Sequence, residues 1–177
     1  MAKKYSADYR LIDSVDEKGR IRTDVEYVGA RYVLSGGEGS GILKRMLRLA
    51  VAAAGFYLPP LLLRSGAMLT VYVTLPYVFT LLPLCLLLTA LWTLCRAEPP
   101  YDRRKADLVN ERLPGASLWL FLLPAISLLG EAAGLLLGRI AFGWGDAIFL
   151  LCAAPAALCG LACFRLRRSL RAEKAPE

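Results

Sequence analysis

The chain has 177 residues, of which 56% are hydrophobic, and its mean hydropathy is +0.47. A soluble domain is about 45–50% apolar, so this composition excludes an ordinary soluble protein and indicates a membrane protein. The sequence contains no histidine, which excludes histidine-based catalytic triads, HExxH zinc sites and histidine proton relays. The net charge is +7, but acidic residues dilute the basic N-terminal segment, and we expect no nucleic-acid partner.

Residues 1–41 predict a cytoplasmic β-hairpin followed by a glycine-rich hinge. Apolar and polar residues alternate over 5–12 and over 21–27, and residues 16–19 between them are typical of a turn. The segment 28–34 could add a third short strand. A lone hairpin is only marginally stable in water. We therefore expect its apolar face to pack on the helix ends, on a second copy or on a partner protein.

Four apolar segments follow the hinge. A helix needs roughly 17–25 mostly apolar residues to cross about 30 Å of hydrocarbon. The segments that qualify lie at about 46–63, 68–92, 117–138 and 146–164. The sequence therefore predicts an all-α membrane protein whose domain 42–164 is a four-helix transmembrane bundle of two antiparallel hairpins. The second segment lies in the longest uncharged run, which predicts a tilted or kinked helix.

The basic residues indicate how these segments cross the membrane. Of the 22 Lys and Arg residues, all but Arg64 and Arg139 lie near the start of the first segment or before it, between the second and third, or after the fourth. This asymmetry is the positive-inside pattern. We expect a multi-pass protein of the cytoplasmic (inner or plasma) membrane with both termini in the cytoplasm. The basic tail 165–177 is expected to bind the anionic inner leaflet, at about 1 kcal/mol per basic residue.

One acidic residue lies inside the third segment. An acid at bilayer depth costs roughly 2.5–3.5 kcal/mol, so such residues are candidates for function. That residue is Glu131, and the polar side chains expected in the same half of the bundle are Ser127, Tyr57, Tyr72, Thr74 and Tyr77. One interpretation is a small proton- or cation-coupled pocket. We favour the other, an interhelical hydrogen bond that fixes packing and is worth about 0.6 kcal/mol.

Small residues recur at helical spacing in the third and fourth segments. Two successive GxxxG steps place Gly130, Gly134 and Gly138 on one face of the third helix. Cys152, Ala156 and Gly160 form a matching row on the fourth. Small residues let helices approach closely in lipid, so these rows predict tight packing of the third helix on the fourth. The alternative is that the glycine row dimerises two chains.

The five cysteines all lie in, or at the end of, apolar segments, where neither a disulfide framework nor a metal site is expected. We expect no metal and no cofactor. The predicted spans contain no pair of acids and no nucleophile with a base, so we expect no enzymatic activity. The first hypothesis is a non-enzymatic accessory or assembly subunit that contacts a cytoplasmic or membrane partner, or a second copy. The alternative is a small oligomeric transporter or channel that uses Glu131 as its coupling or ion-binding carboxylate.

Overall fold

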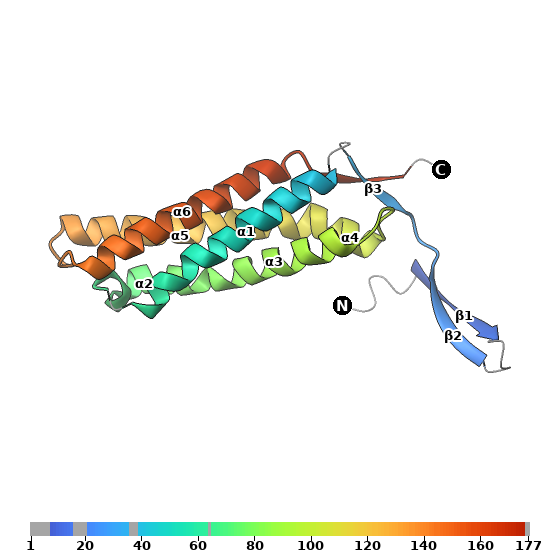
Figure 1. The fold of residues 1–177 in the computed structure, drawn as a ribbon, viewed down its shortest axis with the longest axis horizontal. Helices are drawn as coiled ribbons and strands as arrows, with labels where there is room; N and C mark the ends of the chain where they lie inside the picture. The colour runs from blue at the N-terminus through green and yellow to red at the C-terminus, as the bar shows by residue number, and fades with distance from the viewer. Residues whose placement is uncertain (1–7, 16–20, 36–38, 64, 176–177) are drawn as a thin grey trace.

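The structure is a computed structural model that describes residues 8–15, 21–35, 39–63 and 65–175, and it is mostly helical with two small sheets. In chain order the elements are β1 (Tyr9–Val15), β2 (Ile21–Tyr27), β3 (Tyr32–Ser35), α1 (Gly39–Leu62), the short helix η3 (Ala67–Leu69), α2 (Val71–Phe79), α3 (Leu81–Arg96), α4 (Arg103–Asp107), the π-helical segment η4 (Leu108–Arg112), α5 (Leu113–Leu136), α6 (Trp144–Arg167) and β4 (Arg171–Lys174). The helices lie side by side in one elongated body, with all strands at the same end (Figure 1). We call this end the strand end, and the opposite end, with the turns after α1 and α5, the turn end.

Three helical segments in the described part of the chain are long and apolar enough to cross a membrane. They are Val71–Arg96, Arg103–Leu136 and Trp144–Arg167. Large hydrophobic side chains, including Leu82, Leu129 and Leu151, point away from the other helices and are exposed. Exposed apolar side chains of this size suit a lipid environment, because the neighbouring helices do not cover them. By length and hydropathy, the described residues therefore contain three candidate spans, whereas the sequence predicted four.

The helix that is missing from this group is α1. It has 24 residues, but Lys44, Arg45 and Arg48 lie in its first turns and lower its hydropathy. It begins at Gly39, within the predicted hinge and before the predicted start of the first segment. The last glycines of that hinge are therefore helical. The rest of the predicted hinge includes residues 36–38, which lie outside the described residues.

The predicted second segment is divided at Thr80 into α2 and α3, after the short η3. Pro83 has no backbone N–H, so the carbonyl of Phe79 loses its usual helical donor. The Thr80 hydroxyl donates to the Pro76 carbonyl at 3.1 Å, beside this break. The predicted kink therefore lies where two prolines interrupt the helical ladder.

Packing in the body depends on α6, which lies along both α1 and α5. The α3 helix contacts α1 and α5, and α2 contacts α5. Buried residues recur every three or four positions in α1, as Leu43, Met46, Ala50, Ala53 and Tyr57. This spacing places one apolar stripe of α1 against the neighbouring helices. Close to the strand end, the Cys163 thiol contacts the Met46 carbonyl at 3.7 Å, which joins α6 to α1.

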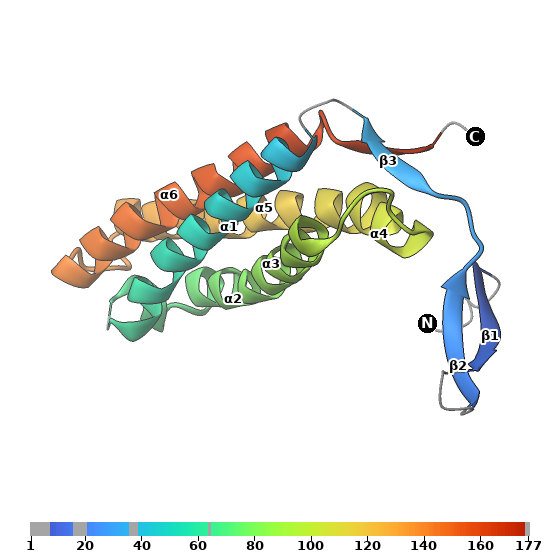
Figure 2. The same ribbon diagram turned by 45° about the vertical axis from the view of Figure 1, so that its right-hand side comes forward.

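The predicted β-hairpin is present in the structure. Strands β1 and β2 pair antiparallel, with Tyr9 opposite Tyr27 and Leu11 opposite Val25. The alternation of apolar and polar residues therefore predicted the two strands that pair, although the expected turn residues 16–19 lie outside the described residues. The hairpin projects beyond the strand end, away from the helices, as Figure 2 shows.

The third strand has a partner that the sequence did not indicate. Strand β3 pairs antiparallel with β4 in the C-terminal tail, from Tyr32 opposite Lys174 to Ser35 opposite Arg171. On its other side, Tyr32 exchanges backbone hydrogen bonds of 2.9 and 2.7 Å with Tyr101, in the loop before α4. The tail expected to lie on the lipid surface therefore contributes a strand that holds the N-terminal segment against the helices.

The η4 segment fixes this tail through one side chain. The Asn110 amide donates to the Ala172 carbonyl, and its oxygen accepts from the Ala172 N–H, both at 3.3 Å. We expect Asn110→Ala to destabilise the tail by about 1 kcal/mol, because its two exposed hydrogen bonds to Ala172 would be replaced by hydrogen bonds to water. Hydrogen exchange should then accelerate at Ala172. Asn110→Asp, which keeps the acceptor and loses the donor, should give an intermediate rate, and equal rates in all three proteins would contradict the role of this side chain.

Candidate functional site

Glu131 lies on the buried stripe of α5, which also carries Leu120, Pro124, Ser127 and Gly134. Its exposed fraction is 0%, and neither carboxylate oxygen has a hydrogen-bond partner among the described residues. Unpaired acids are costly at membrane depth, by roughly 2.5–3.5 kcal/mol on insertion scales. Among the acids of the described helices, Glu131 has both carboxylate oxygens buried without a hydrogen-bond partner.

The surroundings of Glu131 are tightly packed. A Cβ added to Gly130 would lie 3.3 Å from the side chains of Tyr72 and Val73 on α2. A Cβ added to Gly134, one turn later, would lie 2.8 Å from the Tyr72 hydroxyl and would collide with Ile140. The two glycines thus let α2 and the turn after α5 close over this part of α5.

A second buried acid lies close to Glu131. Asp146, in the first turn of α6, is 2% exposed and near enough for its charge to act on Glu131. Its Oδ1 accepts the Ala67 N–H at 2.9 Å, and its Oδ2 accepts the Gly143 N–H at 3.0 Å. Asp146 therefore caps α6 and ties it to the other turn of the turn end. The sequence prediction omitted it, although an acid three residues after Gly143 is a capping signal.

Four of the five hydroxyl groups predicted around Glu131 donate to backbone carbonyls instead. Ser127 bonds Leu123 at 3.1 Å, and Thr74 bonds Met68 at 2.6 Å. A helical hydroxyl reaches the carbonyl of the preceding turn readily, and in hydrocarbon no water competes for it. Tyr72 is 45% exposed, and its ring packs against Gly130. The predicted shell of donors is therefore not assembled around the carboxylate.

The other two tyrosines link three helices. The Tyr57 and Tyr77 rings stack with their centroids 4.9 Å apart, and Tyr77 packs on Phe149 of α6 at 5.0 Å. The Tyr57 hydroxyl donates to the Val78 carbonyl at 3.2 Å, and the Tyr77 hydroxyl donates to the Tyr57 carbonyl at 2.9 Å. These contacts join α1, α2 and α6, so both tyrosines have a structural role.

The structure places the predicted glycine row differently from the sequence hypothesis. The side-chain atoms nearest to a Cβ at Gly130 or Gly134 belong to α2 and to the turn after α5. Gly138 is exposed and has a φ of 64°, a left-handed conformation that ends α5 and suits glycine. The close approach of α5 and α6 lies further toward the strand end. There, a Cβ on Gly160 would lie 2.8 Å from the backbone of Leu120, and Ala156 is buried one turn earlier.

The hairpin carries an exposed apolar surface. Leu11 is 71% exposed and Val25, directly opposite, is 63% exposed. The next pair, Tyr9 and Tyr27, has its ring centroids 5.3 Å apart. We call these four residues the hairpin face. Sequence reasoning predicted their alternation, but not that Leu11 and Val25 would be largely exposed.

The hairpin is attached to the start of α4. The Arg103 N–H donates to the Tyr27 hydroxyl at 2.9 Å, and this hydroxyl donates to the Ala30 carbonyl at 2.8 Å. An Arg103–Asp8 ion pair of 3.6 Å adds a second link. Burial raises the pKa of Tyr27, so the hydroxyl keeps its proton and remains a donor at neutral pH. The hairpin face is therefore presented in a defined orientation.

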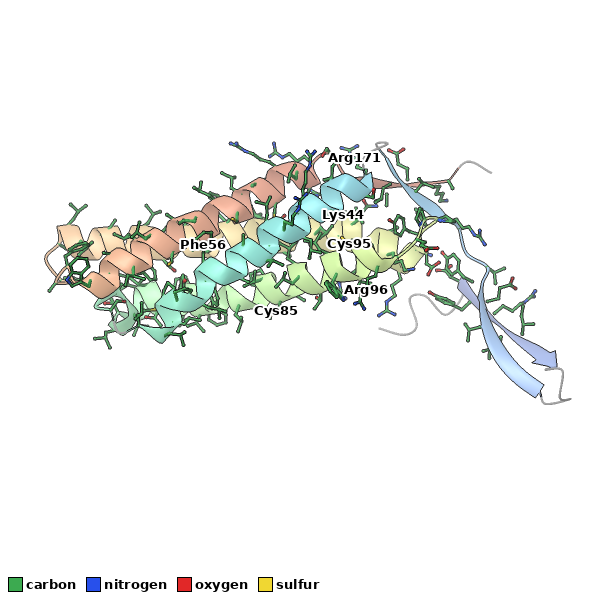
Figure 3. All side chains as sticks on the ribbon, in the orientation of Figure 1. Lys44, Phe56, Cys85, Cys95, Arg96 and Arg171 are labelled. Carbon is green, nitrogen blue, oxygen red and sulfur yellow. The ribbon has the colours of Figure 1, made fainter. Side chains whose placement is uncertain are left out.

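Basic side chains gather at the strand end. Figure 3 shows Lys44 of α1, Arg96 of α3 and Arg171 of β4 in this region. The Arg96 guanidinium lies 4.4 Å from the centroid of the Trp92 ring, and that of Arg168 lies 5.1 Å from the centroid of Phe164. Such stacking suits residues at the boundary between lipid and water.

No further ligand site is indicated by the polar groups. Within the described ranges, no three Cys, Asp or Glu residues lie close enough together to hold a metal ion. A depression of about 350 Å³ lies on η3 and α2 between Met68 and Phe79, and its lining is mainly apolar. Glu131 does not line this depression.

Comparisons with known proteins do not extend this description. No family model matches the chain, and neither the curated proteins nor the solved structures contain a significant match.

Proposed function

We propose that this protein is a four-span membrane protein that acts as a non-enzymatic accessory or assembly subunit. The fourth span would be α1. Its 24 residues correspond to about 36 Å at 1.5 Å per residue, enough to cross about 30 Å of hydrocarbon. It also lies along α6, which is itself a candidate span of 24 residues. The four helices would form a bundle of two antiparallel hairpins.

The strand end would lie in the cytoplasm, together with both termini. Lys44 and Arg45 of α1, Arg96 of α3 and Arg168 after α6 all belong to this end. At the turn end, the described turn after α5 carries only Arg139 as a basic residue. The positive-inside rule assigns the basic end to the cytoplasm. The basic residues at this end would also attract the anionic inner leaflet.

The observation that carries the accessory role is the exposed hairpin face. Leu11 and Val25 are opposite each other, both are largely exposed, and the hairpin is attached to α4 in a defined orientation. An exposed apolar pair on a protruding element favours burial against a protein surface. Interface centres of this kind often contribute much of the binding energy. A cytoplasmic protein or a second copy of the chain would provide the opposing surface.

The alternative function, a small oligomeric transporter or channel that uses Glu131, has one observation in its favour. The Glu131 side chain is buried without a hydrogen-bond partner in the described part of the chain. The hydroxyls that such a pathway would need are bonded to backbone carbonyls. The hairpin face would also have no role in transport. We therefore favour the accessory function.

A photo-crosslinking amino acid at position 11 tests the accessory role in the native membrane. We expect it to capture one protein reproducibly, identified by mass spectrometry. Val25→Asp should reduce that product at least about tenfold, because a charge at an apolar interface centre costs 2 kcal/mol or more. The matched control is Glu26→Ser on the opposite face of β2, which should leave the yield unchanged. Equal capture in both variants, or no specific product, would contradict the proposal.

A further inference from the structure

The Glu131 carboxylate has no hydrogen-bond donor beside it among the described residues. A carboxylate ion away from water needs donors or a cation, whereas a carboxylic acid is uncharged and needs neither. Both Glu131 oxygens are unpartnered among the described residues, and the exposed fraction is 0%. We propose that Glu131 is a proton-binding site: it is held as the neutral acid in the folded protein, and release of this proton loosens α5 from α2 at the turn end.

No described group around Glu131 provides a countercharge. Asp146 is itself an acid, and each of its oxygens already accepts a backbone N–H. Arg139 is exposed. Arg64 lies outside the described residues. On the described parts of the elements packed near this half of α5, the other ionisable side chains are Tyr72 and Tyr77 on α2, Cys85 on α3 and Cys152 on α6. None of these is a cation.

A proton fits this environment better than a metal ion. A metal ion would need several oxygen ligands, and hard cations take six or more. The hydroxyls of Ser127 and Thr74 are engaged with backbone carbonyls, and in the described chain no third acid joins Glu131 and Asp146. The glycines on either side of Glu131 are also closed over by Tyr72, Val73 and Ile140. A proton neutralises the carboxylate without further ligands or space.

Loss of the proton should act on the contact between α5 and α2. The ionised carboxylate would repel the neighbouring Asp146 carboxylate and require water. Water can enter from the turn end, because Glu131 lies about 7–8 Å before the end of α5 at Leu136, at 1.5 Å per residue. To admit it, Tyr72 and Val73 must move away from Gly130, where they now fit closely. Each chain would release one proton to water at this end.

Infrared spectroscopy of the purified full-length protein in detergent tests the protonation directly. We expect the carbonyl stretch of a neutral carboxylic acid at neutral pH, and a shift of this band in heavy water. The band should be absent in Glu131→Gln and unchanged in Glu98→Gln, which alters an exposed acid. Carboxyl-labelled glutamate should shift the band in the wild-type protein, so the assignment does not depend on the folding of a variant.

The pH dependence of the melting temperature tests the loosening. The unfolded state releases this proton above about pH 4–5, where a free glutamate ionises, whereas the folded state keeps it. The contribution of Glu131 to stability should therefore fall as the pH rises from that point, until the folded state also loses the proton. Glu131→Gln should match the wild-type melting temperature near about pH 4 and exceed it by a growing margin at neutral and alkaline pH. Parallel pH profiles for the two proteins would overturn the loosening. Absence of the acid band at neutral pH would overturn the protonation, and its appearance only in Arg64→Gln would identify an ion pair instead.

Discussion

Replacing Gly160 with leucine should separate α5 from α6 and give the largest loss of stability of any single glycine change. Even the Cβ of alanine at this position would lie 2.8 Å from the backbone of Leu120 and from the N–H nitrogen of Phe121. Backbone atoms of a helix cannot rotate away as a side chain can. We expect Gly160→Ala to cost about 1–3 kcal/mol, as overpacking does in protein cores, and Gly160→Leu to cost more.

Reversible unfolding in mixed micelles measures this change. Gly55→Ala is the matched control, since a Cβ on Gly55 of α1 meets nothing within 4 Å. That control should be neutral or stabilise the helix by about 0.5–1 kcal/mol, because alanine has less backbone freedom to lose. If Gly160→Ala and Gly55→Ala have the same effect, then the α5–α6 contact is not as close as the structure places it.

The second large effect is expected at Asp146. Asp146→Ala removes the acceptors of two backbone N–H groups, those of Ala67 and Gly143, and Asp146 and Ala67 are both buried. A buried donor left without an acceptor costs about 1–3 kcal/mol. We therefore expect a loss of about 2–4 kcal/mol, with faster hydrogen exchange at Ala67. Asp146→Asn retains one carbonyl acceptor and should lose about half as much.

The control for Asp146 is a half-buried acid near the surface. Asp102 forms a surface ion pair with Lys105 at 3.7 Å, and such pairs contribute about 0–1 kcal/mol. Asp102→Ala should therefore change stability only slightly. If Asp146→Ala is no more destabilising than Asp102→Ala, then the connection between the two turns at the turn end has no energetic importance.

The candidate site was predictable only in its chemistry. A lone acid in an apolar segment identified Glu131, and its position on a 3–4 spaced stripe with Ser127 is consistent with burial. The fate of the surrounding hydroxyls was not predictable. Thr74 can donate to Met68 because η3 folds back before α2, and this geometry depends on the turn rather than on the spacing of polar residues. Glycine spacing likewise identified a close-packing face, but not which helix would cover it.

The sequence by itself determined the elements that depend on local periodicity. Long apolar runs produced helices that could span a membrane, and the alternation around Leu11 and Val25 produced the predicted hairpin. The charges of α1 also explain why this helix is not among the three candidate spans. These features follow from the order of side chains within one segment. A helix places every third or fourth residue on one face, and a strand places every second residue on one face.

Only the tertiary structure decided which segments meet. The pairing of β3 with β4, the bond from Ala67 to Asp146 across 79 residues, and the contact of Gly160 with Leu120 each join positions far apart in the sequence. Many segments could pair with a free strand edge, and many helices could pack closely against a small residue. The partner is selected by the combined packing of all helices, and no single segment contains that information.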